Sequence, residues 1–115
     1  MISTKLNGSL PARWFDAETA TWFDETFEQD DKGRWLSIHT QRPHMGLRLF
    51  RTATGRYGLC AWRRQELETR NHYYVEKRNH HYLVTDAEAA LWFYRNGTAI
   101  AEAPLPLRKL MEAMS

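Results

Sequence analysis

Residues 47–62 decide the fold, and they read LRLFRTATGRYGLCAW. Two extended runs lie on either side of the turn-forming segment at residues 52–56, in which Gly55 can adopt a positive φ without a steric penalty. A glycine at such a position between two extended runs is typical of a β-hairpin. The stretch therefore predicts two antiparallel strands, over residues 47–52 and 56–64.

Extended patterns continue on both sides of this hairpin. Downstream, two runs rich in Tyr, His and Val predict strands over residues 71–76 and 80–85, joined by a polar turn at residues 76–79. The polar residues 65–70 are expected to connect the two hairpins. Upstream, alternating apolar and polar residues predict a strand over residues 34–40. Because consecutive hairpin strands pair antiparallel, these segments predict one antiparallel sheet of about four to five strands.

Residues 86–96 carry the clearest helix signal. Thr85 and Glu88 have the spacing of a capping box, in which the side chain of each residue bonds the backbone of the other. Asn96 and Gly97 then supply a typical helix end. The face that is expected to point inward carries Ala87, Ala90, Leu91 and Tyr94.

Two further helices are predicted, one near each end of the chain. The last helix covers residues 106–114, because Pro106 fits the first turn of a helix. Its inward stripe is Leu107, Leu110, Met111 and Met114. The first helix covers residues 17–29, where aromatic side chains recur at helical spacing and acidic residues crowd the first turns. The alternative for this segment is a strand, since its threonines, Thr19, Thr21 and Thr26, favour extended structure.

These elements predict an α+β fold in which the helices pack mainly on one face of an antiparallel sheet. A chain of 115 residues fits a single domain over residues 1–115. Aromatic residues make up 13% of the chain, which excludes a disordered protein because disordered chains lack the aromatic side chains that build a core. No apolar run approaches the roughly 20 residues of a membrane span, so a cytoplasmic protein is expected.

Charge is unevenly distributed along the chain, although the formal net charge is only +2. Residues 1–31 contain two basic and seven acidic residues, whereas residues 32–80 contain eleven basic and three acidic residues. In one interpretation the acidic segment folds against the basic one and neutralises it. In the other, the basic segment stays exposed and attracts nucleic acid or an acidic protein.

Residues 48–82 interleave arginine with aromatic side chains, and this mixture suits two functions. Tyr, Trp and Arg are enriched at the energetic centres of protein interfaces. Arginine also binds phosphate, while flat aromatic rings stack on unpaired bases. The sequence favours a small non-enzymatic interaction protein that uses this sheet face to bind a protein partner or a second copy of itself; a single-stranded nucleic-acid-binding protein is the alternative. The candidate binding residues are Arg48, Arg51, Arg63, Tyr73, Tyr74, Lys77, Arg78 and Tyr82.

A third hypothesis is an enzyme or small-ligand protein with a cleft lined by His and Tyr. Its candidate lining residues are His39, His72 and His81. The chain contains no metal-ligand spacing and no glycine-rich phosphate loop, so neither a metal nor another cofactor is expected. Cys60, the single cysteine, lies in an apolar run and is expected to be a buried residue rather than a nucleophile. An enzyme is therefore the less favoured class.

Overall fold

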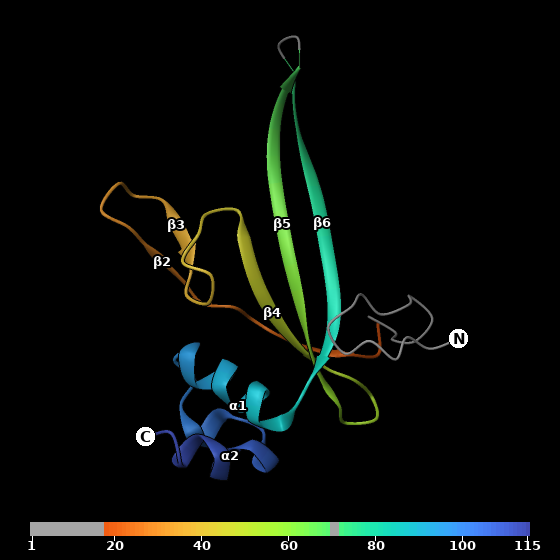
Figure 1. The fold of residues 1–115 in the computed structure, drawn as a ribbon, viewed down its shortest axis with the longest axis vertical. Coiled ribbons are helices and arrows are strands. Elements are labelled where there is room, and N and C mark those ends of the chain that lie inside the picture. Colours follow the sequence, from red (N-terminus) through yellow and green to blue (C-terminus); the bar gives the residue numbers. More distant parts are fainter. Residues whose placement is uncertain (1–17, 70–71) are drawn as a thin grey trace.

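The computed structural model describes residues 18–69 and 72–115, with side chains described at all of these positions except 65–69 and 72–78. The fold is α+β, as predicted, with a four-stranded antiparallel sheet, a two-stranded hairpin and two α-helices (Figure 1). The four-stranded sheet has the order β1-β4-β5-β6 and consists of β1 (Thr21–Phe23), β4 (Met45–Arg51), β5 (Tyr57–Thr69) and β6 (His72–Val84). The hairpin pairs β2 (Phe27–Gln29) with β3 (Trp35–Ser37). The helices are α1 (Asp86–Arg95), the short 3-10 helix η2 (Ile100–Glu102) and α2 (Leu105–Glu112).

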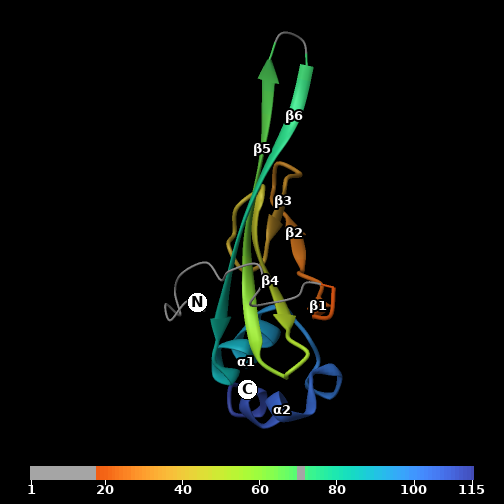
Figure 2. The same ribbon diagram turned by 90° about the vertical axis from the view of Figure 1, so that its right-hand side faces the viewer.

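β4 and β5 form the hairpin that residues 47–62 predict, and Gly55 in their turn has a φ of 89°. Pairing between these two strands ends where Met45 lies opposite Arg63. Within the described residues, β5 then pairs with β6 alone. The two strands leave the sheet as a two-stranded ribbon, residues 64–69 and 72–77, which projects far beyond the other elements in Figures 1 and 2.

Both α-helices pack against one face of the sheet, at the end opposite to the ribbon (Figure 2). The indole N–H of Trp92 donates to the carbonyl of Leu47 at 3.0 Å, which ties α1 to β4. The predicted stripe of the last helix is confirmed, because Leu107 and Met111 are completely buried and the other two members pack against the same core. The buried residues of this core are Leu49, Tyr57, Leu59, Ala89, Ala90, Trp92, Phe93, Ala103, Leu107 and Met111.

The other face of the sheet, here called the outer face, is built on two glycines. Gly58 lies opposite Phe50, and a Cβ at Gly58 would collide with the Phe50 ring. Gly46 lies opposite Trp62, and a Cβ there would collide with the indole. Each glycine therefore allows a large ring from the neighbouring strand to lie flat across the sheet. Phe50 is completely buried as a result.

The helix predicted over residues 17–29 is wrong, because the described part of this segment forms β1 and β2. Phe23 points to the helices and meets Phe93 at a centroid distance of 4.9 Å. Its neighbour Trp22 points to the outer face and meets Phe50 at 5.2 Å. Adjacent aromatic residues that are buried on opposite faces follow the period of a strand. Pairing with β4 therefore outweighed the helical spacing. The strand alternative is confirmed in part, because the segment is extended but forms two short strands, and of the three threonines only Thr21 lies in one of them.

The second predicted hairpin is also misplaced. Residues 76–79 are not a turn but part of β6, and residues 65–69 are not a connection but part of β5. The predicted strands 71–76 and 80–85 are thus one strand. The polar residues of the ribbon resemble a loop in sequence, because a two-stranded ribbon without a third strand needs no continuous apolar face. The strand predicted over residues 34–40 is shorter, since only β3 is extended, and it belongs to the separate hairpin.

Helix α1 has the predicted bounds and capping but a different buried face. The Thr85 hydroxyl accepts from the Glu88 N–H, and the Glu88 carboxylate accepts from the Thr85 N–H, which confirms the capping box. Gly97 follows the helix with a φ of 80°. Ala87, Leu91 and Tyr94, expected inside, are exposed. The side chains that α1 buries are Ala89, Ala90, Trp92 and Phe93. The helix is rotated so that the rings of Trp92 and Phe93 are buried, because burial of these two side chains removes the most apolar surface from water.

Candidate functional site

The ribbon leaves the sheet at a group of four residues, here called the ribbon root: Trp62, Arg63, Arg64 and Asn79. These residues line a hollow of about 250 Å³. Strand β5 is held at this point by the Arg64 N–H, which donates to the carbonyl of His44 at 2.8 Å just before β4 begins. The ribbon root is therefore a fixed part of the fold, from which the ribbon extends.

The backbone register pairs basic residues with basic residues at the ribbon root. The register of β5 and β6 places Arg63 opposite Arg78 and Arg64 opposite Lys77, so two successive pairs each join two basic residues. Like charges at opposite positions of a ribbon repel each other and destabilise it. Arg63 and Arg64 are exposed, and neither forms an ion pair with a residue that the structure describes. A negatively charged partner at this place would relieve the repulsion.

A half-buried carboxylate joins the hairpin to the ribbon root. Glu25 accepts hydrogen bonds from the Trp62 indole at 2.7 Å and from the Leu47 N–H at 3.0 Å. It also accepts from the hydroxyl of Ser37, a fully buried residue of β3. Glu25 thus accepts three hydrogen bonds. They hold the indole of Trp62 in one orientation and fasten the β2–β3 hairpin to the sheet.

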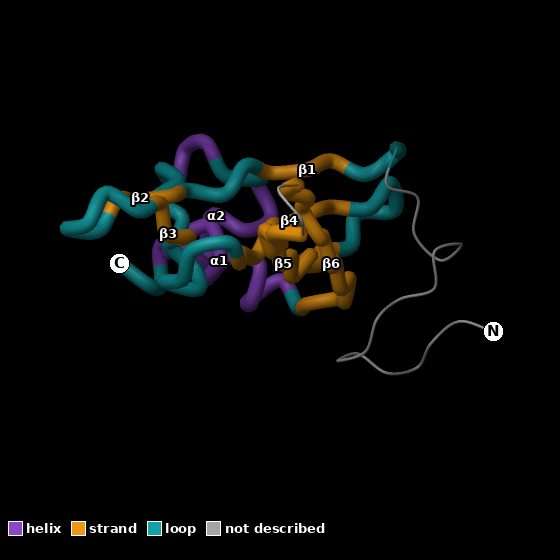
Figure 3. The backbone as a smooth tube through the Cα atoms, turned by 90° about the horizontal axis from the view of Figure 1, so that it is seen from above, coloured by secondary structure: helices purple, strands orange, loops and turns teal. Residues whose placement is uncertain are grey.

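Two exposed aromatic residues, here called the hairpin aromatics, share one face of the β2–β3 hairpin, and one of them, Phe27, lies next to the ribbon root. Phe27 on β2 is 40% exposed, and its ring lies 6.2 Å from the ring of Trp62. Trp35 on β3 is 61% exposed. Because Phe27 lies opposite Ser37, Trp35 shares the face of Phe27, one diagonal position further along the hairpin. Figure 3 shows this hairpin on the β4 side of the sheet, away from β6.

The sequence missed both hairpin aromatics. It assigned Phe27 to the buried stripe of a helix and gave Trp35 no function. The signal that could have indicated an exposed ring is the position of Trp35 shortly after the turn at residues 30–33. A strand next to the tight turn of a short hairpin has little structure to cover its side chains.

The predicted binding residues are divided between the two faces of the sheet. Arg48 lies on the outer face, with its guanidinium 4.8 Å from the centre of the Trp22 ring and 3.7 Å from the exposed Asp24 carboxylate. Arg51 is exposed at the end of β4, and Tyr82 packs against the core under α1. Of this predicted set, Arg63 lies at the ribbon root. Tyr73, Tyr74, Lys77 and Arg78 belong to β6, but their side chains lie outside those that the structure describes.

The aromatic residues of the central strands serve mainly as internal packing. Phe50 and Tyr57 are buried, and burial raises the pKa of Tyr57 and, in the half-buried Tyr82, the pKa of that phenol as well. Cys60 is buried beneath the outer face as predicted, and burial raises the pKa of its thiol. The most exposed of the described rings, Phe27, Trp35 and Tyr94, lie on the hairpin and on α1.

The candidate histidines do not converge. His39 stacks on Trp92 at 4.7 Å, and its Nε2 lies 3.0 Å from Oδ1 of Asn96. That oxygen accepts from the Thr26 N–H while the Asn96 amide donates to the Asp24 carbonyl, so Nε2 of His39 is the donor. His81 instead lies on the outer face with Trp22 and Phe50, and the His72 side chain is outside the described ones. Within the described residues, no three His, Cys, Asp or Glu side chains gather as metal ligands.

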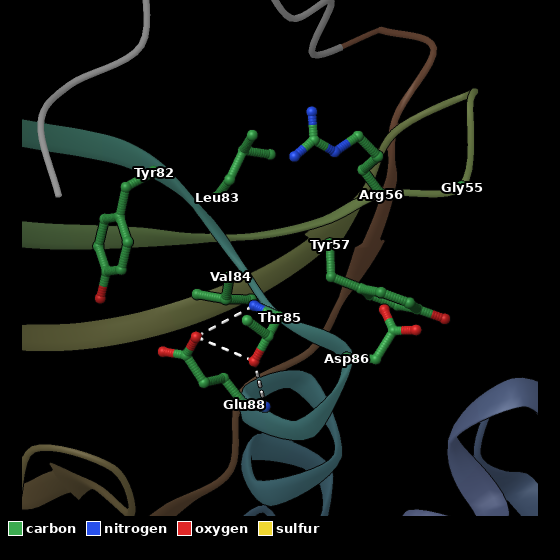
Figure 4. A pocket seen from close by; sticks show the side chains of 9 residues that line it. All are labelled: Gly55, Arg56, Tyr57, Tyr82, Leu83, Val84, Thr85, Asp86 and Glu88. Atoms are coloured by element: carbon green, nitrogen blue, oxygen red, sulfur yellow. Dashed lines mark hydrogen bonds between the residues drawn. The ribbon is translucent and has the colours of Figure 1, made fainter. Parts of the chain in front are cut away.

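A second hollow, of about 390 Å³, lies where β6 runs into α1 (Figure 4). Its polar groups include Thr85 and Glu88, which bond each other in the capping box and so serve the start of the helix. Asp86 adds a second carboxylate, and Arg56 lines the opposite side. The hollow combines opposite charges around groups that are already bonded, so it has less unbalanced charge than the ribbon root.

Comparisons with known proteins add no relative, since no protein-family model, curated protein or solved structure matches the chain. In the part of the chain that the structure describes, no helix is long and apolar enough to cross a membrane.

Proposed function

We propose that this protein binds nucleic acid through the ribbon root. The observation that carries the proposal is the register of β5 and β6, which sets Arg63 against Arg78 and Arg64 against Lys77 where the ribbon leaves the sheet. Phosphate groups are the natural counter-charge for such a group, because arginine presents several N–H donors in a fixed fork. Binding of phosphates would remove a repulsion that the free protein carries.

Three features support nucleic acid over a partner that docks on the aromatic sheet face. Phe50 and Tyr57, which such an interface would use, are buried in the protein itself. The cations at the ribbon root, by contrast, are exposed. In addition, Trp62 and Asn79 add a ring and an amide to the lining of the same hollow, so charge and polar recognition lie together.

The test is fluorescence anisotropy with labelled oligonucleotides at several salt concentrations. Wild-type protein should bind, with an affinity that falls as salt rises, because phosphate contacts release counterions. The double variant Arg63→Ala/Arg64→Ala should bind oligonucleotides of every sequence more weakly. The slope of log affinity against log salt concentration, here called the salt slope, should become shallower by about 1.4 on single strands, which corresponds to two lost phosphate contacts.

A matched control removes two cations elsewhere. The variant Arg95→Ala/Lys109→Ala changes the net charge equally but alters exposed residues of α1 and α2. It should retain wild-type affinity and salt slope. Equal losses in the two double variants would mean that overall charge alone drives binding, and this result would contradict a site at the ribbon root.

A second candidate function is self-association through β6, which the interaction hypothesis from the sequence also allows. β6 is 13 residues long and forms an edge of the sheet, with no described strand on its outer side. A long unpaired edge is a template for pairing with another chain. Light scattering over a range of protein concentrations tests this candidate, and a constant monomer mass would rule it out.

A further inference from the structure

We infer that the nucleic acid is single-stranded and that its bases stack on the hairpin aromatics Phe27 and Trp35. This inference rests on the proposed function and names the substrate class of the same site. The ribbon root supplies cations for the phosphates, and the hairpin supplies two exposed rings, of which Phe27 lies against Trp62 of the ribbon root. Unpaired bases are the ligands that use both, because their flat faces are free to stack.

The exposure of the two rings needs an explanation. Trp35 is 61% exposed and makes no ring contact with a described residue, although the protein buries or half-buries its other described tryptophans, Trp22, Trp62 and Trp92. Large apolar side chains in water that lie together on one surface mark binding sites. The neighbouring cations indicate an anionic partner rather than an apolar one.

The arrangement of the rings suits a strand that crosses from the ribbon root to the hairpin. Phe27 is in contact with Trp62, which lines the same hollow as Arg63 and Arg64. Trp35 is the diagonal neighbour of Phe27 on the paired strand. Diagonal neighbours on a hairpin lie about 7 Å apart. Each ring can therefore receive its own base. Glu25 supports this geometry by fastening both Trp62 and β3.

Duplex DNA would use a different part of the molecule. A two-stranded ribbon fits the major groove, but the bases in that groove stay stacked on each other and leave no face for Phe27 or Trp35. A duplex ligand would therefore depend on the ribbon and its cations and would be insensitive to the hairpin aromatics. This difference separates the two ligands experimentally.

The experiment measures the affinity for an oligothymidylate of about 12 nucleotides, within the usual site size of single-strand binders, and for a duplex of the same length. Wild-type protein should prefer the single strand. Trp35→Ala should weaken single-strand binding about tenfold, the loss expected for one stacked base, without changing the salt slope. Trp35→Phe should restore most of the affinity, because a phenyl ring still stacks.

Tyr94→Ala is the matched control, since Tyr94 is a 46% exposed aromatic residue on α1. It should bind the single strand as wild type does. The inference is overturned if the duplex binds at least as tightly as the single strand, or if Trp35→Ala leaves single-strand affinity unchanged. In both cases a reduced salt slope in Arg63→Ala/Arg64→Ala would still support the proposed function, whereas absence of all nucleic-acid binding would refute both.

Discussion

The two halves of β5 differ although they form one continuous strand. From Tyr57 to Trp62 the strand lies between β4 and β6, and it buries Tyr57 and Leu59 on one face and Cys60 on the other. From Arg64 onward it has β6 as its described partner and carries polar and charged residues. The first half holds the fold together, and the second half extends a charged ribbon from it. The proposed binding site lies where these two halves meet, at Trp62, Arg63 and Arg64.

The largest expected effect belongs to the helix that covers the first half of β5. Phe93→Ala should lower the free energy of unfolding by about 3–5 kcal/mol, because Phe93 is 3% exposed and its removal leaves a cavity between α1 and β1. Urea denaturation measures the loss. Tyr94→Ala, one position along, should cost far less, and equal losses would show that α1 buries a different face.

A smaller effect is expected on the outer face of the same half. Gly58→Ala should destabilise the protein by about 1–3 kcal/mol, because the added methyl group collides with the Phe50 ring. The same substitution combined with Phe50→Leu should cost less than the sum of the two single changes, since the smaller side chain leaves room. Additive losses in a denaturation cycle would mean that the ring does not depend on the glycine.

The connection between the hairpin and α1 should respond to pH. Burial lowers the pKa of His39 below its usual value of 6.5; the hydrogen bond that His39 donates to Asn96 and the charge of Glu25 oppose this effect, and the charge of Arg95 adds to it. The unfolded chain therefore binds a proton before the folded one, so stability falls as pH drops below about 6.5 and levels off below the folded pKa.

Burial also lowers the pKa of His81, so this residue contributes to the same loss of stability at low pH. Denaturation curves above and below this pH should show a smaller drop in His39→Gln than in wild type. An identical drop in both proteins would assign the pH dependence to other groups.

The smallest effect on stability is expected at the ribbon root. Arg63→Ala/Arg64→Ala should change the free energy of unfolding by no more than about 0.5 kcal/mol, as is usual for exposed residues without a special role. Any change at low salt should be towards greater stability, because the substitutions remove like-charge pairs. Thermal unfolding at low and high salt checks this, and a large loss would mean that the two arginines hold the ribbon to the sheet.

Local signals predicted well where neighbouring residues along the chain determine the structure. The capping box at Thr85, the turn at Gly55 and the proline at the start of α2 each act within a few residues, and each was correct. The segment of residues 17–29 was misassigned because its threonines and its aromatic spacing favour different structures. Contact with β4, about 25 residues further along the chain, decided between them.

Of the residues that carry the candidate site, the sequence named Arg63, Lys77 and Arg78 but not Trp62, Arg64 or Asn79. The interleaving of arginine and aromatic residues does not show which rings are covered: of the described rings of β5, Tyr57 is buried in the core and Trp62 lies on the outer face. Trp35 and Phe27 belong to a hairpin that reaches the ribbon root through Glu25, and no local pattern connects residues that are 37 positions apart.

The α+β class, the β4–β5 hairpin, the capped helix and the concentration of positive charge in the middle of the chain can all be read from the order of the residues. These properties follow from turn chemistry, capping and composition, which act locally. In contrast, the burial of particular rings, the extension of β5 beyond β4 and the pairing of basic residues across the ribbon become visible only in the folded chain. These properties depend on strand register and on the burial of apolar surface between distant segments, and both are settled when the whole chain packs.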